Sequence, residues 1–223
     1  MLDFILVTPT TGNVTSETCM CEQTLRWARG LSYRWWHCTE DGLGRGRSLA
    51  VTKYLKGDLG EAPYLIFVDR DVVFSPRHIQ MLLDELQTKD VVAGLYPIGS
   101  LCQIAVYNHG NSMKVDKTVQ EFQFVSTGFM GITKDILQRL ADTMPLLHKN
   151  EQNPLYPFFC SRPFTLGNGD EVYLTEDWDF CEKVRDVGGT VWAHTGLQLK
   201  HKKSHLVGIG DVFTFEKEEK DGD

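Results

Sequence analysis

The hydrophobic positions of this chain form short apolar runs that alternate with stretches of helical periodicity. The runs are rich in β-branched and aromatic residues, which predicts buried strands at 4–7, 33–37, 64–68 and 91–93. Amphipathic patterns between and after them predict helices at 17–29, 48–56 and 77–87. Because strands and helices alternate, the first half of the chain predicts an α/β fold with a parallel sheet and right-handed crossovers.

The second half is less regular. Its patterns predict two paired strands at 103–107 and 121–125 and a late strand at 197–200. They also predict two helices, one from about Thr133 and one after Thr175. Residues 149–170 are rich in proline, asparagine, glycine and aromatic residues and show no clear periodicity. We expect this segment to pass over the active-site face, because long loops are usually functional or mobile.

Length, composition and charge narrow the class of protein. A chain of 223 residues with 42% hydrophobic content suits one well-packed domain and is short for two, so we assign 1–210 to the domain and the charged residues 211–223 to a tail or linker. The net charge of −7 argues against a nucleic-acid partner. No segment is apolar enough to span a membrane and no basic export signal opens the chain, so we expect a cytoplasmic protein with reduced cysteines.

The apolar run 64–68 ends in an acidic pair, Asp69 and Asp71. Ligands bind at the carboxyl edge of the strands in open α/β sheets. If the chain stays extended, both carboxylates lie on one side of it and Arg70 on the other. Two such oxygen ligands suit Mn²⁺ or Mg²⁺, which take their remaining ligands from phosphate and water. The alternative is a solvated turn, because two aspartates at this spacing are a weak motif alone.

A second acidic group, Glu176, Asp177 and Asp179, directly follows Thr175. Thr175 is a good N-cap, and carboxylates in a first helical turn are stabilised by the free N–H groups and the helix dipole. Helix formation alone therefore explains these residues. The acidic pair at 69–71 supplies the functional alternative, in which both groups serve one site.

Four motifs in this order resemble the nucleotide-diphospho-sugar transferase (GT-A) fold. They are DRD at 69–71, STGFMGI at 126–132, TEDWDFCEKVRDVGG at 175–189 and VWAHTGLQLKH at 191–201. The resemblance implies a single Rossmann-like domain with a central, mostly parallel sheet, flanking helices and a small antiparallel part. More narrowly, the chain resembles the N-terminal glycosyltransferase domain of chlorella-virus proteins that build capsid glycans. That likeness implies fusion to further domains and a place in the host cytoplasm.

The resemblance also implies roles for single positions. Asp71 and His201 match direct metal ligands, and Asp69 matches the carboxylate that reaches the metal or the ribose through water. His194 is a weaker candidate for a metal ligand than His201. Asp177, or less readily Glu176, matches the base that an inverting enzyme needs, whereas retaining members need none. Residues that match nucleotide-sugar contacts are Thr8, Pro9, Thr10, Arg45, Arg47, Asp69, Arg70, Ser126, Thr127 and Gly128. For Arg45 and Arg47 a solvated Gly-Arg loop is an equal alternative.

The sequence is compatible with three functions. The first is a metal-dependent glycosyltransferase that moves a sugar from a UDP-linked hexose, or a deoxyhexose such as rhamnose, to the hydroxyl of a glycan acceptor. The second is a sugar-phosphate nucleotidyltransferase, but such enzymes open with a glycine-rich, cationic loop where this chain has TPTTGNVTSET. The third is a non-catalytic carbohydrate-binding module that stacks sugars on tryptophan, although most of the five tryptophans fall at core-like positions.

Overall fold

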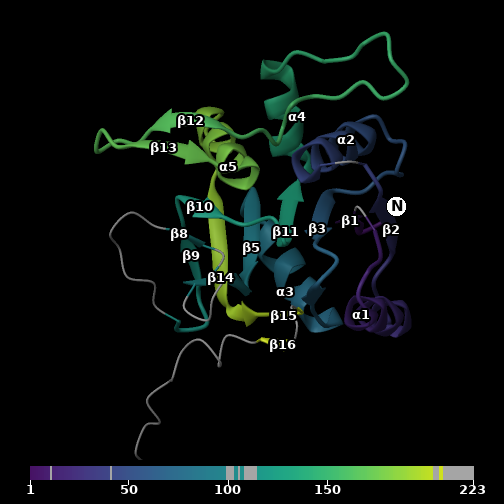
Figure 1. The fold of residues 1–223 in the computed structure, drawn as a ribbon. Helices are drawn as coiled ribbons and strands as arrows, with labels where there is room; N and C mark the ends of the chain where they lie inside the picture. Colours follow the sequence, from purple (N-terminus) through teal and green to yellow (C-terminus); the bar gives the residue numbers. More distant parts are fainter. Residues whose placement is uncertain are drawn as a thin grey trace, which may run out of the picture.

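The computed structural model describes residues 1–10, 12–40, 42–98, 103–104, 106–107, 115–202 and 206–207. A seven-stranded sheet in the order β2-β1-β3-β11-β5-β14-β9 forms its centre, with helices on both faces (Figure 1). The expected α/β class is therefore confirmed. The charged segment 211–223 lies outside the described residues, and the division of the chain into a domain and a tail stays a prediction.

The elements of the main sheet and its helices have the following bounds. The strands are β1 Phe4–Pro9, β2 Tyr33–Cys38, β3 Tyr64–Val68, β5 Val91–Leu95, β9 Val119–Glu121, β11 Phe129–Thr133 and β14 Val191–Gln198. The helices are α1 Ser16–Trp27, α2 Leu43–Leu55, α3 Pro76–Leu86, α4 Lys134–Thr143 and α5 Glu176–Asp186. Shorter strands are β4 Val72–Val73, β6 Pro97–Ile98, β7 Gln103–Ile104, β8 Val106–Tyr107, β10 Phe124–Val125, β12 Arg162–Thr165, β13 Glu171–Leu174, β15 Lys200–Lys202 and β16 Leu206–Val207.

The sheet is mostly parallel, as expected. β1 pairs in parallel with β2 and β3, and β5 pairs in parallel with β14. Strand β11 lies between β3 and β5 and is antiparallel to both, and β9 is antiparallel to β14. The sequence did not predict β11 as a strand of the sheet. Its run Phe129–Thr133 connects the two parallel halves and ends at Thr133, whose hydroxyl caps α4, so this helix begins where the sequence predicts it.

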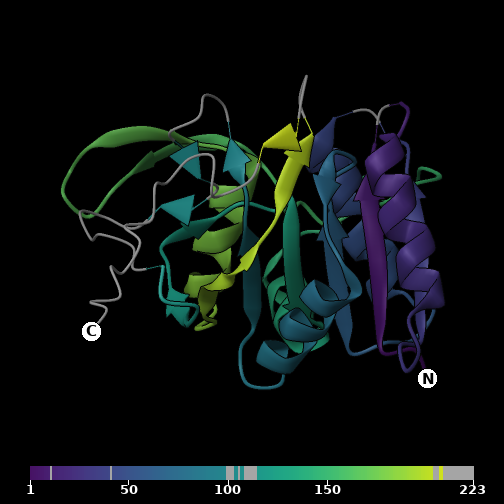
Figure 2. The same cartoon turned by 90° about the horizontal axis from the view of Figure 1, so that it is seen from below.

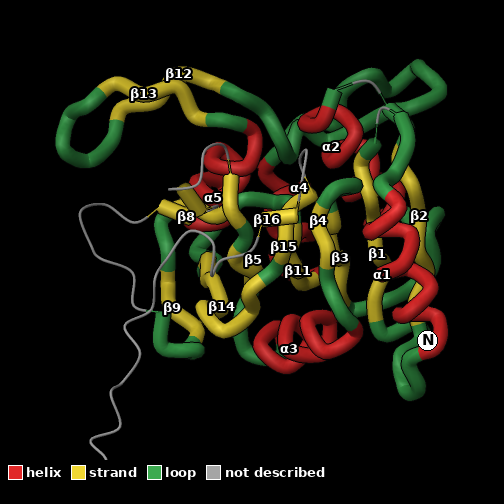
Figure 3. Tube along the Cα trace, turned by 60° about the horizontal axis from the view of Figure 1, so that its bottom comes forward, coloured by secondary structure: helices red, strands yellow, loops and turns green. Residues whose placement is uncertain are grey.

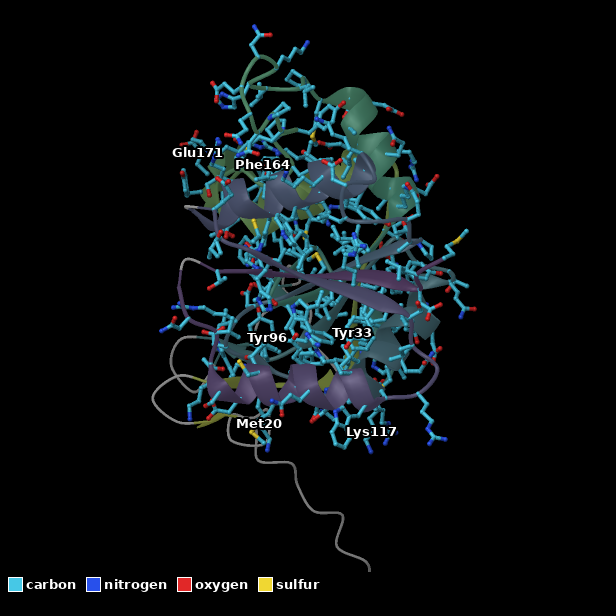
Figure 4. All side chains as sticks on the ribbon, turned by 90° about the vertical axis from the view of Figure 1, so that its right-hand side faces the viewer. Met20, Tyr33, Tyr96, Lys117, Phe164 and Glu171 are labelled. Carbon is cyan, nitrogen blue, oxygen red and sulfur yellow. The ribbon has the colours of Figure 1, made fainter. Side chains whose placement is uncertain are left out.

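Two hydrophobic layers enclose the sheet. Helices α2, α4 and α5 pack on one face and α1 and α3 on the other, as the two turned views show (Figures 2 and 4). Alternate residues of β3 point into the two layers: Phe67 packs in the layer of α2, α4 and α5, and Ile66 in the layer of α1 and α3. The β12–β13 hairpin extends beyond the sheet (Figure 3). Among the described helices, none is long and apolar enough to cross a bilayer.

Several predicted boundaries were wrong. β1 continues to Pro9 because it pairs with β2 as far as Cys38. α2 begins at Leu43 instead of residue 48, after Gly42 has turned the chain at a φ of 82°. Glycine accepts this conformation readily, but the glycines of the first turn have low helix propensity and concealed the helix in the sequence.

The later strands were predicted only in part. Tyr107 does pair with Phe124, joining β8 to β10, whereas 119–121 forms the separate strand β9 on the edge of the main sheet. The irregular segment 149–170 contains β12. The late strand was placed too far along the chain, because β14 already begins at Val191.

Candidate functional site

The acidic pair at the end of β3 lies in a turn. The backbone N–H of Val72 donates to the carbonyl oxygen of Asp69 over 3.1 Å, and the hydroxyl of Thr18 donates to that of Arg70 over 2.8 Å. The expectation of an extended chain was therefore wrong, because β3 stops at Val68. Asp69 and Asp71 consequently have different neighbours.

Asp71 faces His201. Nε2 of His201 lies 3.1 Å from Oδ2 of Asp71, and the imidazole is only 9% exposed. His201 is the middle residue of β15, which pairs with β4 directly after the acidic turn. The N–H of Lys202 also donates to the carbonyl oxygen of Asp71 over 2.7 Å, so the backbone fixes the two side chains against each other.

The other ring nitrogen of His201 shows what this pair can hold. Nδ1 lies 2.7 Å from the carbonyl oxygen of Pro97, which can only accept, so Nδ1 carries the hydrogen. In the neutral imidazole, Nε2 then carries the lone pair and lies 3.1 Å from the carboxylate of Asp71, whereas a protonated ring would donate a hydrogen bond from Nε2 to it. An imidazole lone pair beside a carboxylate is a donor set for a divalent cation, and a backbone carbonyl behind the ring is a common outer-shell partner.

The described residues contain no group of three or more His, Cys, Asp or Glu side chains placed to hold a metal ion. Asp71 and His201 would therefore provide two protein ligands. Mg²⁺ and Mn²⁺ commonly bind through one or two carboxylates and complete their shell with substrate phosphates and water. The residues present fit such an ion.

A cavity of about 250 Å³ opens beside the acidic turn. Four of the residues predicted to contact the nucleotide sugar line it, together with Asp71 and the unpredicted Leu43: Pro9, Thr10, Asp69 and Arg70. Thr8 does not line it, because its buried hydroxyl accepts a hydrogen bond of 2.9 Å from the indole N–H of Trp35. Leu43 is 46% exposed. In the sequence, Leu43 is marked only as an isolated apolar residue between two glycines.

Arg47 connects the two acidic groups of the sequence. Its buried guanidinium lies 2.8 Å from Oδ1 of Asp69 and 3.0 Å from Oε1 of Glu176. Burial alone would lower the pKa of Arg47, but the two carboxylates outweigh burial and raise it. The solvated-loop alternative was therefore wrong for Arg47. Arg45 lies at the surface, 3.4 Å from Glu40, and does not line the cavity.

The segment Ser126–Gly128 lies directly behind the acidic turn. The carbonyl oxygen of Gly128 accepts from the N–H of Asp69 over 2.9 Å, and the N–H of Gly128 donates to the hydroxyl of Tyr96 over 3.0 Å. A Cβ at position 128 would collide with the Tyr96 hydroxyl and lie 3.1 Å from Oδ2 of Asp69. Only glycine fits here. Burial, reinforced by the charge of Asp69, raises the pKa of Tyr96. Thr127 is buried at 1% exposure.

Asp177 joins this segment to α5. Its Oδ2 accepts from the hydroxyl of Ser126 over 2.6 Å, and its Oδ1 accepts from the hydroxyl of Thr175 and from the N–H of Trp178. Thr175 precedes the helix, but its hydroxyl donates to Asp177 and caps no backbone N–H.

Asp179 is fully buried and pairs with Arg162 and Lys183. The sequence did not identify Tyr96 as a site residue, and nothing in its immediate neighbours marked it.

The strand order and layers define a GT-A-like Rossmann fold. No protein-family model matches the chain, and no curated protein matches it. Among solved structures, A197 from STIV has a TM-score of 0.61 at 17% identity, over 94% of this chain and 92% of that one.

A second similar structure is that of GalNAc-T7 with UDP, GalNAc and Mn²⁺. Its TM-score is 0.51 at 10% identity, and the match covers 90% of this chain but only 44% of the GalNAc-T7 chain. At these identities the likeness concerns the fold, which agrees with the GT-A resemblance of the sequence. The narrower likeness to a chlorella-virus domain stays a prediction.

Proposed function

We propose that this protein is a metal-dependent glycosyltransferase that moves a sugar from a nucleotide-diphosphate donor to the hydroxyl of a glycan acceptor. The observation that carries the proposal is the Asp71–His201 pair, whose side chains lie 3.1 Å apart and whose Asp71 lines the cavity beside the acidic turn. The fold supports it, because GalNAc-T7 was solved with UDP, GalNAc and Mn²⁺ and resembles this chain.

The donor site follows from the residues that line this cavity. Pro9 and Thr10 form its β1 side, and Arg70 is an exposed cation at its rim that can contact a diphosphate. Asp71 and His201 would hold Mn²⁺ or Mg²⁺, which, when bound, offsets the negative charge of the leaving diphosphate. We assign the donor to the UDP-linked hexoses or deoxyhexoses, such as UDP-rhamnose.

Asp177 is the residue that we assign to the acceptor. Its bond to Ser126 places its carboxylate next to the segment that we expect beside the donor sugar. In an inverting reaction, Asp177 takes the proton of the attacking hydroxyl. In a retaining reaction, the same carboxylate orients the sugar. Glu176 is less suited to either role, because its carboxylate is paired with Arg47.

The metal assignment is tested by UDP binding to an Asp71→Ala variant. At a UDP concentration a hundred times its Kd, a wild-type protein with Mn²⁺ gains about 2.7 kcal/mol of stability, which is about 5–11 °C in Tm for a chain of this size. We expect Asp71→Ala to lose this gain while its Tm without ligand stays near that of wild type. Asp58→Ala removes an exposed aspartate after α2 and is the matched control.

Turnover tests the reaction itself. We expect the wild-type protein with Mn²⁺ to release UDP slowly from a UDP-sugar even without an acceptor, and Asp71→Ala to release none. Equal stabilisation of Asp71→Ala and wild type by UDP with Mn²⁺ would refute the metal assignment. Binding without any release of UDP, over a panel of UDP-sugars, would favour a carbohydrate-binding module instead.

A further inference from the structure

A second cavity, of about 440 Å³, lies between the first turn of α3 and the end of β14. The residues that line it are Arg77, His78, Met81, Lys117, His194 and Gly196. None of the described residues that line it is acidic, although the whole chain carries a net charge of −7. This cavity lies on the α1/α3 side of the sheet. Figure 4 shows Lys117 at that surface, away from Phe164 and Glu171.

Both histidines of this cavity have the same ring arrangement. Nδ1 of His78 accepts a hydrogen bond of 3.2 Å from the N–H of Ser75, and Nδ1 of His194 accepts one of 3.1 Å from the N–H of Gly196. A nitrogen that accepts carries no hydrogen, so the hydrogen of each neutral ring is on Nε2. Each imidazole therefore presents an N–H donor, and the backbone fixes this tautomer.

Lys117 is held next to His194 by the backbone. The N–H of Thr195 donates to the carbonyl oxygen of Thr118 over 2.8 Å, and β9 pairs Val119 with His194. Lys117 itself has a φ of 64°, which is rare for a residue other than glycine. A Cβ added at Gly196 would lie 3.0 Å from Cβ of Lys117 and 3.1 Å from Cε1 of His194, so these two residues meet at the backbone of Gly196.

Asp116 is the carboxylate closest in sequence to the cavity residues. Its Oδ1 accepts from the N–H and the hydroxyl of Thr118 and from the side-chain amide of Gln120. The hydrogen bond from the Thr118 hydroxyl is the main reason that the pKa of Asp116 is lowered. The hydroxyl of Thr195 on β14 also donates to Oδ1 of Asp116 over 3.4 Å. These bonds hold the Asp116 carboxylate between its own loop and β14, and it does not line the cavity.

We propose that this cavity binds an oxyanion, namely a phosphate or sulfate group, between the Nε2–H donors of His78 and His194 and the cations Arg77 and Lys117. Two neutral N–H donors and two cations, placed on α3, on β14 and in the loop before β9, suit a group with several acceptor oxygens. A metal cation does not fit, because both imidazoles would approach it with N–H groups. This anion site is separate from the Asp71–His201 pair and does not depend on the glycosyltransferase proposal.

The test uses the full chain in EDTA, so that no divalent metal recruits anions to the acidic turn. Inorganic phosphate or sulfate is titrated against chloride at constant ionic strength, and ring ¹⁵N and ¹H signals of the histidines are followed by NMR. We expect the Nε2–H tautomer for His78 and His194 before titration, and saturable shifts of both rings with a Kd on the order of 1–10 mM, as for partly exposed charges.

Two substitutions complete the test. Lys117→Gly removes the ammonium group and relieves the positive φ, so the variant should fold, and we expect its Kd for phosphate to rise about three- to tenfold. Lys149→Gln removes one exposed cation elsewhere and should leave the Kd unchanged.

A titration with glucose 6-phosphate distinguishes a phosphate ester from the free phosphate ion as the natural ligand. Tighter binding than that of phosphate indicates an ester, and weaker binding indicates the free ion. Ring signals that respond equally to chloride, or a Lys117→Gly titration identical to that of wild type, would overturn the site.

Discussion

Arg47 is the residue whose removal should reveal most about the candidate active site. Its guanidinium is 3% exposed and pairs with Asp69 and Glu176, each of which is 25% exposed. Arg47→Met keeps most of the buried apolar volume but leaves two carboxylates without their shared cation. Breaking a buried ion pair costs about 3–5 kcal/mol, and we expect about 3 because both carboxylates retain contact with water.

The assay is thermal denaturation without ligand or metal. A loss of about 3 kcal/mol lowers the Tm of a chain of this length by about 6–12 °C. Arg45→Met is the matched control, because Arg45 lies two positions earlier on α2 and pairs with Glu40 at the surface. Exposed pairs contribute at most about 1 kcal/mol, so the control should lose at most about 2–4 °C.

A double substitution tests the cause of the loss. Glu176→Gln removes one of the two carboxylates that Arg47 neutralises, so it should cost less in the Arg47→Met background than in wild type. We expect a coupling free energy of about 1 kcal/mol or more. Additive effects, or an Arg47→Met variant within about 2 °C of wild type, would refute a structural role. A normal Tm combined with lost UDP binding would instead show that Arg47 contacts the nucleotide.

Three further predictions concern single residues. Gly128→Ala should destabilise the chain by about 1–3 kcal/mol in denaturant unfolding, because its Cβ meets Tyr96, whereas Gly167→Ala has open space and should not. Burial, with help from Arg77, lowers the pKa of His78 below 6.5, so stability should fall as pH drops below 6.5, and His78→Gln should flatten that slope. Asp177→Asn should slow sugar transfer about a hundredfold to ten-thousandfold with UDP affinity preserved, and wild-type turnover would contradict its assignment.

The parts of the fold that could be predicted depend on local patterns. Apolar runs of strand length identified β1, β2, β3 and β5, and the amphipathic periodicity of α3 and α5 was strong enough to place both helices. The acidic pair was correctly placed at the end of β3 for the same reason. Its conformation was not, because the N–H of Val72 closes a turn that the sequence does not signal.

The contacts that assemble the site are mostly between distant segments, and no local pattern reports them. Arg47 and Glu176 are 129 positions apart, and Gly128 and Tyr96 are 32 apart. Whether Arg47 in the Gly-Arg-Gly-Arg stretch is solvated or buried depends on which distant segment packs against this stretch. Phe159 belongs to such a segment, because its carbonyl oxygen would lie 2.8 Å from a Cβ at Gly44.

His194 and His201 show why residue type alone does not decide a ligand. Nδ1 of His201 donates to the carbonyl oxygen of Pro97, so in the neutral ring Nε2 carries the lone pair, 3.1 Å from Asp71. Nδ1 of His194 accepts from the N–H of Gly196, so its Nε2 offers a hydrogen. The two proposals therefore assign the same side chain, seven positions apart, to a cation in one place and to an anion in the other. The backbone group next to Nδ1 makes the difference: it is the carbonyl oxygen of Pro97 in β6 for His201, and the N–H of Gly196, two positions along β14, for His194.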